Sequence, residues 1–178
     1  AKVSGEEKGA SIRVTDEAAA GGVHSLKLTD APGLSAIWQP HMWYSPVIRR
    51  GVAILSFDVR LEAGARLVHQ WRDWRTNPFK TGPTLIFEAG GDLRAGGRVV
   101  TRVPVGQWLR VVIRSPIGRE AKTFALSVST PGAEPIRVDD LPMSTEGFRQ
   151  LNWVGFISEA EDRSVIYLDN VDLRREEP

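Results

Sequence analysis

Apolar and polar residues alternate along most of the chain, which is the period of strands with one buried and one solvated face. The clearest case is residues 52–64, with the sequence VAILSFDVRLEAG. One face of this segment carries Leu55, Phe57, Val59 and Leu61, and the other carries Ser56, Asp58, Arg60 and Glu62. The pattern predicts a strand that covers an apolar core on one side and meets water on the other.

Similar alternation predicts several more strands, at residues 10–17, 24–31, 83–91, 107–115, 123–132, 151–160 and 164–174. Turn residues follow two of these segments, at Gly90–Gly91 and Pro131–Gly132. Helical signals are limited to single turns at Ala18–Ala20 and around Ser144–Phe148. Many short strands with this punctuation predict an all-β fold, an antiparallel β-sandwich of the jelly-roll type.

The length and composition fit one soluble domain that spans residues 1–178. The formal net charge of +1 provides no overall field for nucleic acid or an anionic membrane, so neither is expected as a partner. No apolar run approaches the length of a membrane span. The absence of cysteine excludes disulfides and thiolate metal sites. The opening AKVSGEEKG reads as the start of a mature or excised piece of a longer protein.

Three segments together resemble carbohydrate-binding modules and concanavalin-like jelly-roll domains. They are GGVHSLKLTD at residues 21–30, ILSFDVRLEAG at 54–64 and VIYLDNVDLR at 165–174. Their order and spacing match the opening, long central and closing strands of such domains. The resemblance implies a β-sandwich that is tethered to, or secreted with, an enzyme that acts on polysaccharides. It also implies a bacterial protein that is secreted, periplasmic or attached to the cell surface.

The segment VHQWRDWRT, residues 68–76, departs from simple alternation. One set of alternate residues is Leu67, His69, Trp71 and Asp73, and the other is Val68, Gln70, Arg72 and Trp74. Neither set is apolar, as expected for a strand that crosses a ligand groove. Indoles provide flat apolar platforms for sugar rings, and the polar side chains provide hydrogen bonds at their edges. Alternatively, the indoles fill the core and the arginines form surface ion pairs.

A second aromatic stretch, IWQPHMWYSP at residues 37–46, contains Trp38, His41, Trp43 and Tyr44. Two prolines bracket it, so a loop or an edge strand is expected. It contributes either to a sugar or protein contact, or to a lid over the end of the core. Trp108 and Trp153 are both predicted to be structural.

Several kinds of catalysis lack their characteristic residues. The chain has neither a cysteine nor a G-x-S-x-G motif, and the acidic strand pattern of concanavalin-like hydrolases is absent. A polysaccharide lyase stays open as an alternative, since such enzymes use a Tyr or His base and neutralise a uronate carboxylate. His41, Tyr44, His69, Gln70 and Arg72 are of the types required.

A structural calcium ion is a further expectation. Oxygen ligands suit Ca²⁺, and related sugar-binding modules often hold the ion between the N-terminal segment and the last strand. The resemblance would assign Asp169 to that site, with Glu17 or Asp30 as its partner. Asp30 equally suits a turn, because Ala31 and Pro32 follow it, and Asp169 with Asn170 suits a strand end.

The leading interpretation is a carbohydrate-binding domain without catalytic activity that holds a polysaccharide in a groove. The alternatives are a jelly-roll polysaccharide lyase and a protein-interaction or adhesion domain. The residues expected to contact the ligand are His41, Trp43, Tyr44, His69, Gln70, Trp71, Arg72, Trp74 and Arg75.

Overall fold

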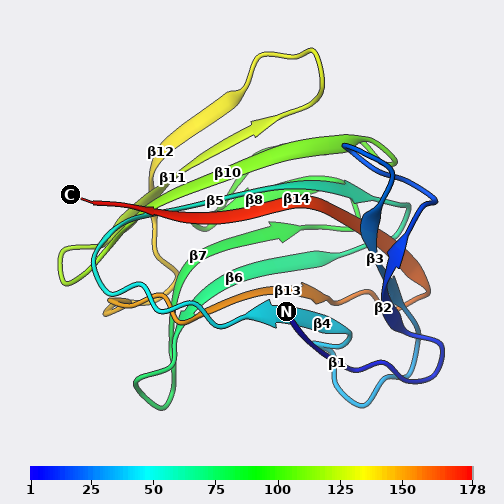
Figure 1. Cartoon of the computed structure of the whole chain (residues 1–178), viewed down its shortest axis with the longest axis horizontal. Coiled ribbons are helices and arrows are strands. Elements are labelled where there is room, and N and C mark those ends of the chain that lie inside the picture. Colours follow the sequence, from blue (N-terminus) through cyan, green and yellow to red (C-terminus); the bar gives the residue numbers. More distant parts are fainter. Residues whose placement is uncertain (178) are drawn as a thin grey trace.

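The computed structural model describes residues 1–177 as two antiparallel sheets of seven strands each. The first sheet has the order β1 (Lys2–Ser4), β4 (His41–Tyr44), β13 (Trp153–Ser158), β6 (Leu67–Asp73), β7 (Lys80–Phe87), β8 (Asp92–Ala95) and β9 (Arg98–Arg102). The second has the order β12 (Ile136–Pro142), β11 (Thr123–Ser129), β10 (Trp108–Ile117), β5 (Gly51–Leu61), β14 (Ser164–Glu176), β3 (Ser25–Asp30) and β2 (Ser11–Thr15). Figure 1 shows how strands distant in the sequence, such as β5 and β14, run side by side.

This architecture confirms the predicted all-β fold, an antiparallel β-sandwich of the jelly-roll type. The two single helical turns predicted at residues 18–20 and 144–148 are wrong, because both segments form bends and turns instead. The described residues include no helix that could cross a membrane.

The core lies between the two sheets and takes alternate residues from the inner face of each. From β5, the residues Leu55, Phe57 and Val59 point inward, as their alternation predicts. The first sheet contributes Phe87 from β7 and Phe156 from β13. Removing these side chains from water is the main favourable term for folding.

Trp71 and His69 also belong to this core, so the expectation that they contact a ligand is wrong. Both lie on the inner face of β6 and are fully buried. The Trp71 Nε1–H donates a hydrogen bond to His69 Nε2 at 3.0 Å. The imidazole packs among the rings of Phe57 and Phe156, with centroid distances of 5.1 and 4.6 Å. This hydrogen bond satisfies the buried indole N–H and one of the two imidazole nitrogens, whereas His69 Nδ1 is buried without a hydrogen-bond partner among the described residues.

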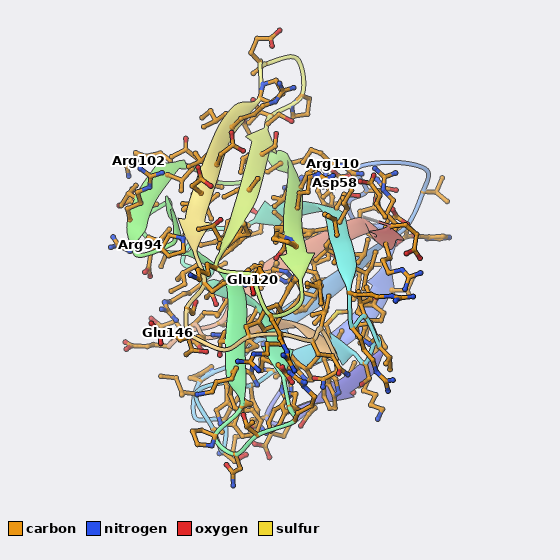
Figure 2. The ribbon with its side chains drawn as sticks, turned by 90° about the vertical axis from the view of Figure 1, so that its left-hand side faces the viewer. Asp58, Arg94, Arg102, Arg110, Glu120 and Glu146 are labelled. Carbon is orange, nitrogen blue, oxygen red and sulfur yellow. The ribbon has the colours of Figure 1, made fainter. Side chains whose placement is uncertain are left out.

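The outer face of the second sheet carries ion pairs between neighbouring strands. Arg110 on β10 lies 3.3 Å from the carboxylate of Asp58 on β5 and also donates to Ser56 Oγ at 2.8 Å. Figure 2 shows Arg110 and Asp58 beside each other. A second pair joins Arg60, near the end of β5, to Glu62, which directly follows that strand, at 2.7 Å. This is the solvated face that the alternation of residues 55–62 predicts.

Replacing Trp71 with Ala is expected to lower the free energy of unfolding by about 3–5 kcal/mol, because it opens a large cavity in the core. The matched change Trp74→Ala is expected to cost under about 1 kcal/mol, since that indole is 52% exposed. Chemical denaturation of the two variants measures both effects. Equal losses would contradict the opposite orientation of these two tryptophans.

The free energy of unfolding is also expected to fall as the pH is lowered from about 6.5 to about 3, because of His69. Burial lowers the pKa of His69 from 6.5 to about 3, whereas the backbone of Gly155 acts weakly in the opposite direction. The unfolded state therefore binds more protons than the folded state in this window, and acidification favours unfolding. The slope due to this residue approaches about 1.4 kcal/mol per pH unit. Denaturation series at several pH values should show a shallower dependence for His69→Gln, which retains an acceptor for Trp71.

Candidate functional site

An open groove of about 1010 Å³ runs across the outer face of the first sheet, over β1, β4, β13, β6 and β7. Alternation creates it, because the residues between the inward-facing ones must point outward from these strands. The lining residues are mostly aromatic or polar: Ser4, Trp38, His41, Trp43, Ser45, Gln70, Arg72, Trp74, Phe79, Thr81, Asn152, Trp153, Ile157 and Glu159.

The pairing register of β4, β13 and β6 places the residues at the centre of the groove next to one another. Gly155 on β13 is paired with Trp43 on β4 and with Gln70 on β6. Two residues earlier on β13, Trp153 is paired with Arg72. Residues separated by more than 80 positions in the sequence therefore lie side by side.

Gly155 forms the floor on which the Trp153 indole rests. A Cβ at position 155 would lie 1.9 Å from the Trp153 ring, which is far inside van der Waals contact. Only glycine leaves room for the indole to lie against the strand. Trp153 is 7% exposed, yet it faces the groove and not the space between the sheets. The prediction that it is a core residue is correct about burial and wrong about the face.

The guanidinium of Arg72 lies above this floor, 4.0 Å from the centre of the Trp153 ring and 4.6 Å from that of Phe79. Its Nε and Nη2 donate to Gln70 Oε1 at 3.0 and 2.7 Å. Within residues 1–177, no carboxylate oxygen lies within 4.0 Å of it. Burial lowers the pKa of Arg72 to about 10, opposed by the charge of Glu159. The group therefore still carries its positive charge at neutral pH.

His41 lies farther along the groove, on β4. Its imidazole stacks on Trp43 with the ring centres 4.8 Å apart, and it meets the Trp38 ring edge-on at 5.2 Å. Its Nδ1 is buried without a hydrogen-bond partner in the described part of the chain. Burial lowers the pKa of His41, and the positive charge of Arg72 lowers it further. The imidazole is therefore neutral at neutral pH.

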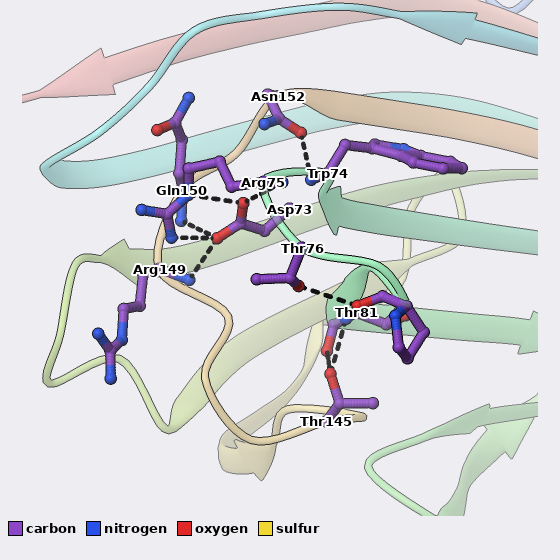
Figure 3. A network of polar contacts seen from close by, with 10 residues as sticks. Asp73, Trp74, Arg75, Thr76, Thr81, Thr145, Arg149, Gln150 and Asn152 are labelled. Atoms are coloured by element: carbon purple, nitrogen blue, oxygen red, sulfur yellow. Dashed lines mark hydrogen bonds and ion pairs between the residues drawn. The ribbon is translucent and has the colours of Figure 1, made fainter.

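Residues 74–79, between β6 and β7, form the rim of the groove at this end, and Asp73 holds the start of this loop (Figure 3). Its carboxylate accepts hydrogen bonds from the guanidinium of Arg75 and from the backbone N–H groups of Arg149 and Gln150. Burial alone would raise the pKa of Asp73, but these hydrogen bonds together lower it. Arg75 is thus engaged by Asp73 and does not line the groove, so its predicted ligand contact is not supported.

The same rim positions Trp74 and Phe79. The backbone N–H of Trp74 donates to Asn152 Oδ1 at 2.9 Å (Figure 3). The Trp74 ring packs on Phe79 with the centres 4.5 Å apart and remains 52% exposed. The two rings form a partly open apolar edge beside Arg72.

The structure brings five of the nine predicted ligand residues together in the groove: His41, Trp43, Gln70, Arg72 and Trp74. Tyr44 does not join them, because it points inward and packs against the core, and burial raises its pKa. Phe79, Asn152 and Trp153 line the groove without having been predicted as ligand contacts, whereas Trp38 lies in the aromatic stretch expected to contact a sugar or a protein. For Trp153, the signal was a glycine two positions later, on the same face of the strand.

The three predicted calcium ligands lie in separate hydrogen-bond networks. Glu17 binds Lys27 and accepts from the Tyr167 hydroxyl, and Asp169 accepts from the backbone of Ala20 and Gly21. Asp30 is paired with Ser164 in the strand register, five residues before Asp169 on β14, which separates the two by about 17 Å along the strand. Asp30 and Asp169 therefore cannot share one ion. Residues 1–177 contain no cluster of three or more potential metal ligands from His, Asp and Glu, and calcium binding stays a prediction.

Comparisons with known proteins support the fold. No protein-family model matches the chain, and no curated protein sequence does either. Among solved structures, an alginate lyase of the PL-14 type from Aplysia kurodai has a TM-score of 0.69 at 11% identity, covering 98% of this chain and 89% of that one. An endo-β-1,4-glucuronan lyase from Trichoderma reesei has a TM-score of 0.66 at 13% identity, covering 98% and 90%.

A third structure, named cellulose induced protein Cip1, has a TM-score of 0.66 at 12% identity and covers 99% of this chain and 91% of that one. All three likenesses extend over nearly the whole chain. At these levels of identity they show a shared fold, and the chemistry of the site has to be argued from its own residues.

Gly155→Ala is expected to displace the Trp153 indole, because the added methyl group would occupy the position of its ring. The indole N–H signal of Trp153 in a two-dimensional NMR spectrum should shift strongly. Gly90→Ala is the matched control, since a Cβ there meets nothing within 4 Å. An unchanged Trp153 signal in the Gly155→Ala variant would contradict the described floor.

Proposed function

We propose that this domain binds a polysaccharide in the groove of the first sheet without cleaving it. The observation that carries the proposal is a set of aromatic rings around an open groove with polar groups between them. Trp38 and Trp74 are 48% and 52% exposed, although large apolar side chains normally avoid water. Sugar rings have apolar C–H faces that stack on indoles and hydroxyl groups that bind polar side chains.

The shape of the groove favours a chain over a single sugar. The lining residues come from five neighbouring strands, β1, β4, β13, β6 and β7, and from the loops beside them. The outer two of these strands lie roughly 19 Å apart. The groove is open to solvent, so a polymer can lie across it. A polysaccharide ligand also fits the expectation of a domain that acts outside the cell as part of a larger protein.

The charged residues support binding more than hydrolysis. Glycoside hydrolysis generally uses two carboxylates on either side of the bond to be cleaved. Of the residues lining the described groove, Glu159 alone is acidic, and it forms an ion pair with Arg66. Arg66 in turn bonds Glu88 at 3.0 Å. Glu159 is therefore occupied by a structural interaction.

A second candidate function is a polysaccharide lyase, and His41 is the observation that favours it. A lyase removes a proton beside a sugar carboxylate, so it requires a neutral base and a cation that stabilises the negative charge. His41 has a depressed pKa and faces the groove that contains Arg72. The ring of Tyr44, the other candidate base, points toward the core.

Trp43→Ala and Trp74→Ala are each expected to weaken polysaccharide binding by about tenfold or more, equivalent to about 1.4 kcal/mol. Trp108→Ala is the control, because Trp108 lies on the second sheet beside Tyr167. A glycan array followed by calorimetry on the best ligand measures the effect. An equal loss in the Trp108 variant, or binding that no glycan competes, would contradict a glycan site in the groove.

The lyase candidate predicts an ultraviolet absorbance from unsaturated products when the protein is incubated with uronate-containing glycans. Mutation of His41 to Ala should abolish that signal even at ligand concentrations that saturate the variant, because the reaction then lacks its base. Tyr44→Phe is the control, since that hydroxyl is not part of the groove. Binding without any product in the wild-type protein supports the primary proposal.

A further inference from the structure

Arg72 has no acidic partner among residues 1–177, in contrast to Arg66, Arg75 and Arg110. Arg66 bonds Glu88 and Glu159, Arg75 bonds Asp73, and Arg110 bonds Asp58. Arg72 has only the neutral oxygen of Gln70 and the aromatic rings around it. A guanidinium that has lost water without gaining a negative charge is costly to keep in a folded protein. The position of Arg72 in an open groove explains why this cost is tolerated, because a ligand can supply the missing negative charge.

We propose that the groove selects acidic polysaccharides and that the carboxylate of a uronic acid unit binds the free edge of the Arg72 guanidinium. This inference rests on the proposed polysaccharide-binding function and names the class of ligand. It assigns Arg72 as the residue that distinguishes an acidic sugar from its neutral counterpart.

The hydrogen bonds of Arg72 leave a suitable edge for a carboxylate. Gln70 Oε1 accepts from both Nε and Nη2, which fixes the plane of the guanidinium and occupies one side of it. Nη1 makes no hydrogen bond to any described residue, and Nη2 has a second N–H group. These two nitrogens form a fork that matches the two oxygens of a carboxylate.

The aromatic rings near this fork provide a place for the sugar that carries the carboxylate. Phe79 lies 4.6 Å from the guanidinium carbon and packs against the exposed ring of Trp74. A pyranose ring stacked on this edge can direct its C5 carboxylate toward Arg72. Stacking would hold the sugar ring, and the ionic hydrogen bonds would select its charge.

Glu159 is the acidic residue among those that line the groove, and its carboxylate does not bind Arg72 in place of a ligand carboxylate. Its carboxylate bonds Arg66, which also bonds Glu88. Glu159 follows β13 at the end that is paired with Leu67, whereas Arg72 is paired with Trp153 at the other end of the strand. Its negative charge is thus held at the Arg66 end of the groove, and within residues 1–177 no oxygen atom accepts from Nη1 of Arg72.

The test compares a hexuronate oligosaccharide with the same oligosaccharide after reduction of its carboxyl groups to neutral alcohols. Calorimetry measures both ligands against the wild-type protein and the variants Arg72→Gln and Arg72→Lys. Arg49→Gln is the matched control, because Arg49 is an exposed arginine outside the groove. Thermal melting of each variant establishes that it is folded.

The wild type is expected to bind the acidic ligand at least about tenfold more tightly than the reduced one. Arg72→Gln should lose that preference and retain the weak binding of the neutral ligand. Arg72→Lys should restore part of the preference, because it keeps the charge and loses the fork. Arg49→Gln should behave as wild type.

Equal binding of the two ligands by the wild type would overturn the inference and leave the groove as a neutral glycan site. A preference for the acidic ligand that persists in Arg72→Gln would also overturn the inference, because a different basic residue would then bind the carboxylate. Failure of both ligands and of every glycan on an array would instead contradict the proposed function itself.

Discussion

The packing of the two sheets through alternate residues is the constraint on which the rest of the structure depends. Trp71, Phe156 and Met42 point inward from β6, β13 and β4, where they are fully buried. Because successive side chains of a strand alternate between its faces, this packing directs the residues next to them outward. The same hydrophobic contacts that hold the sandwich together therefore also determine which residues line the groove.

On the outer face of the first sheet, the side chains that line the groove are held in place by contacts with one another. Gly155 leaves room for the indole of Trp153, and the indole carries the guanidinium of Arg72. Gln70 fixes the plane of that guanidinium, while Asn152 and Asp73 position the rim that bears Trp74. Side chains held by such second contacts present a preformed surface, which lowers the entropy lost when a ligand binds.

The sequence alone predicted the class of fold because alternation is a local property of each strand. It also predicted the general position of the groove, since Gln70, Arg72 and Trp74 fall on one set of alternate residues. The pairing of β6 with β13 could not be read from the sequence, because it depends on contacts between residues far apart in the chain. Without that register, the sequence could not decide between the groove and the core for Trp71, and it could not place Trp153 on the groove face.

NMR observation of the six tryptophan indole N–H groups during titration with a bound oligosaccharide tests the central claim most directly. If the outer face of the first sheet is the binding surface, the signals of Trp38, Trp43, Trp74 and Trp153 shift with ligand. Those of Trp71 in the core and Trp108 on the second sheet stay in place. Shifts confined to Trp108, with the four groove indoles unchanged, would contradict the account.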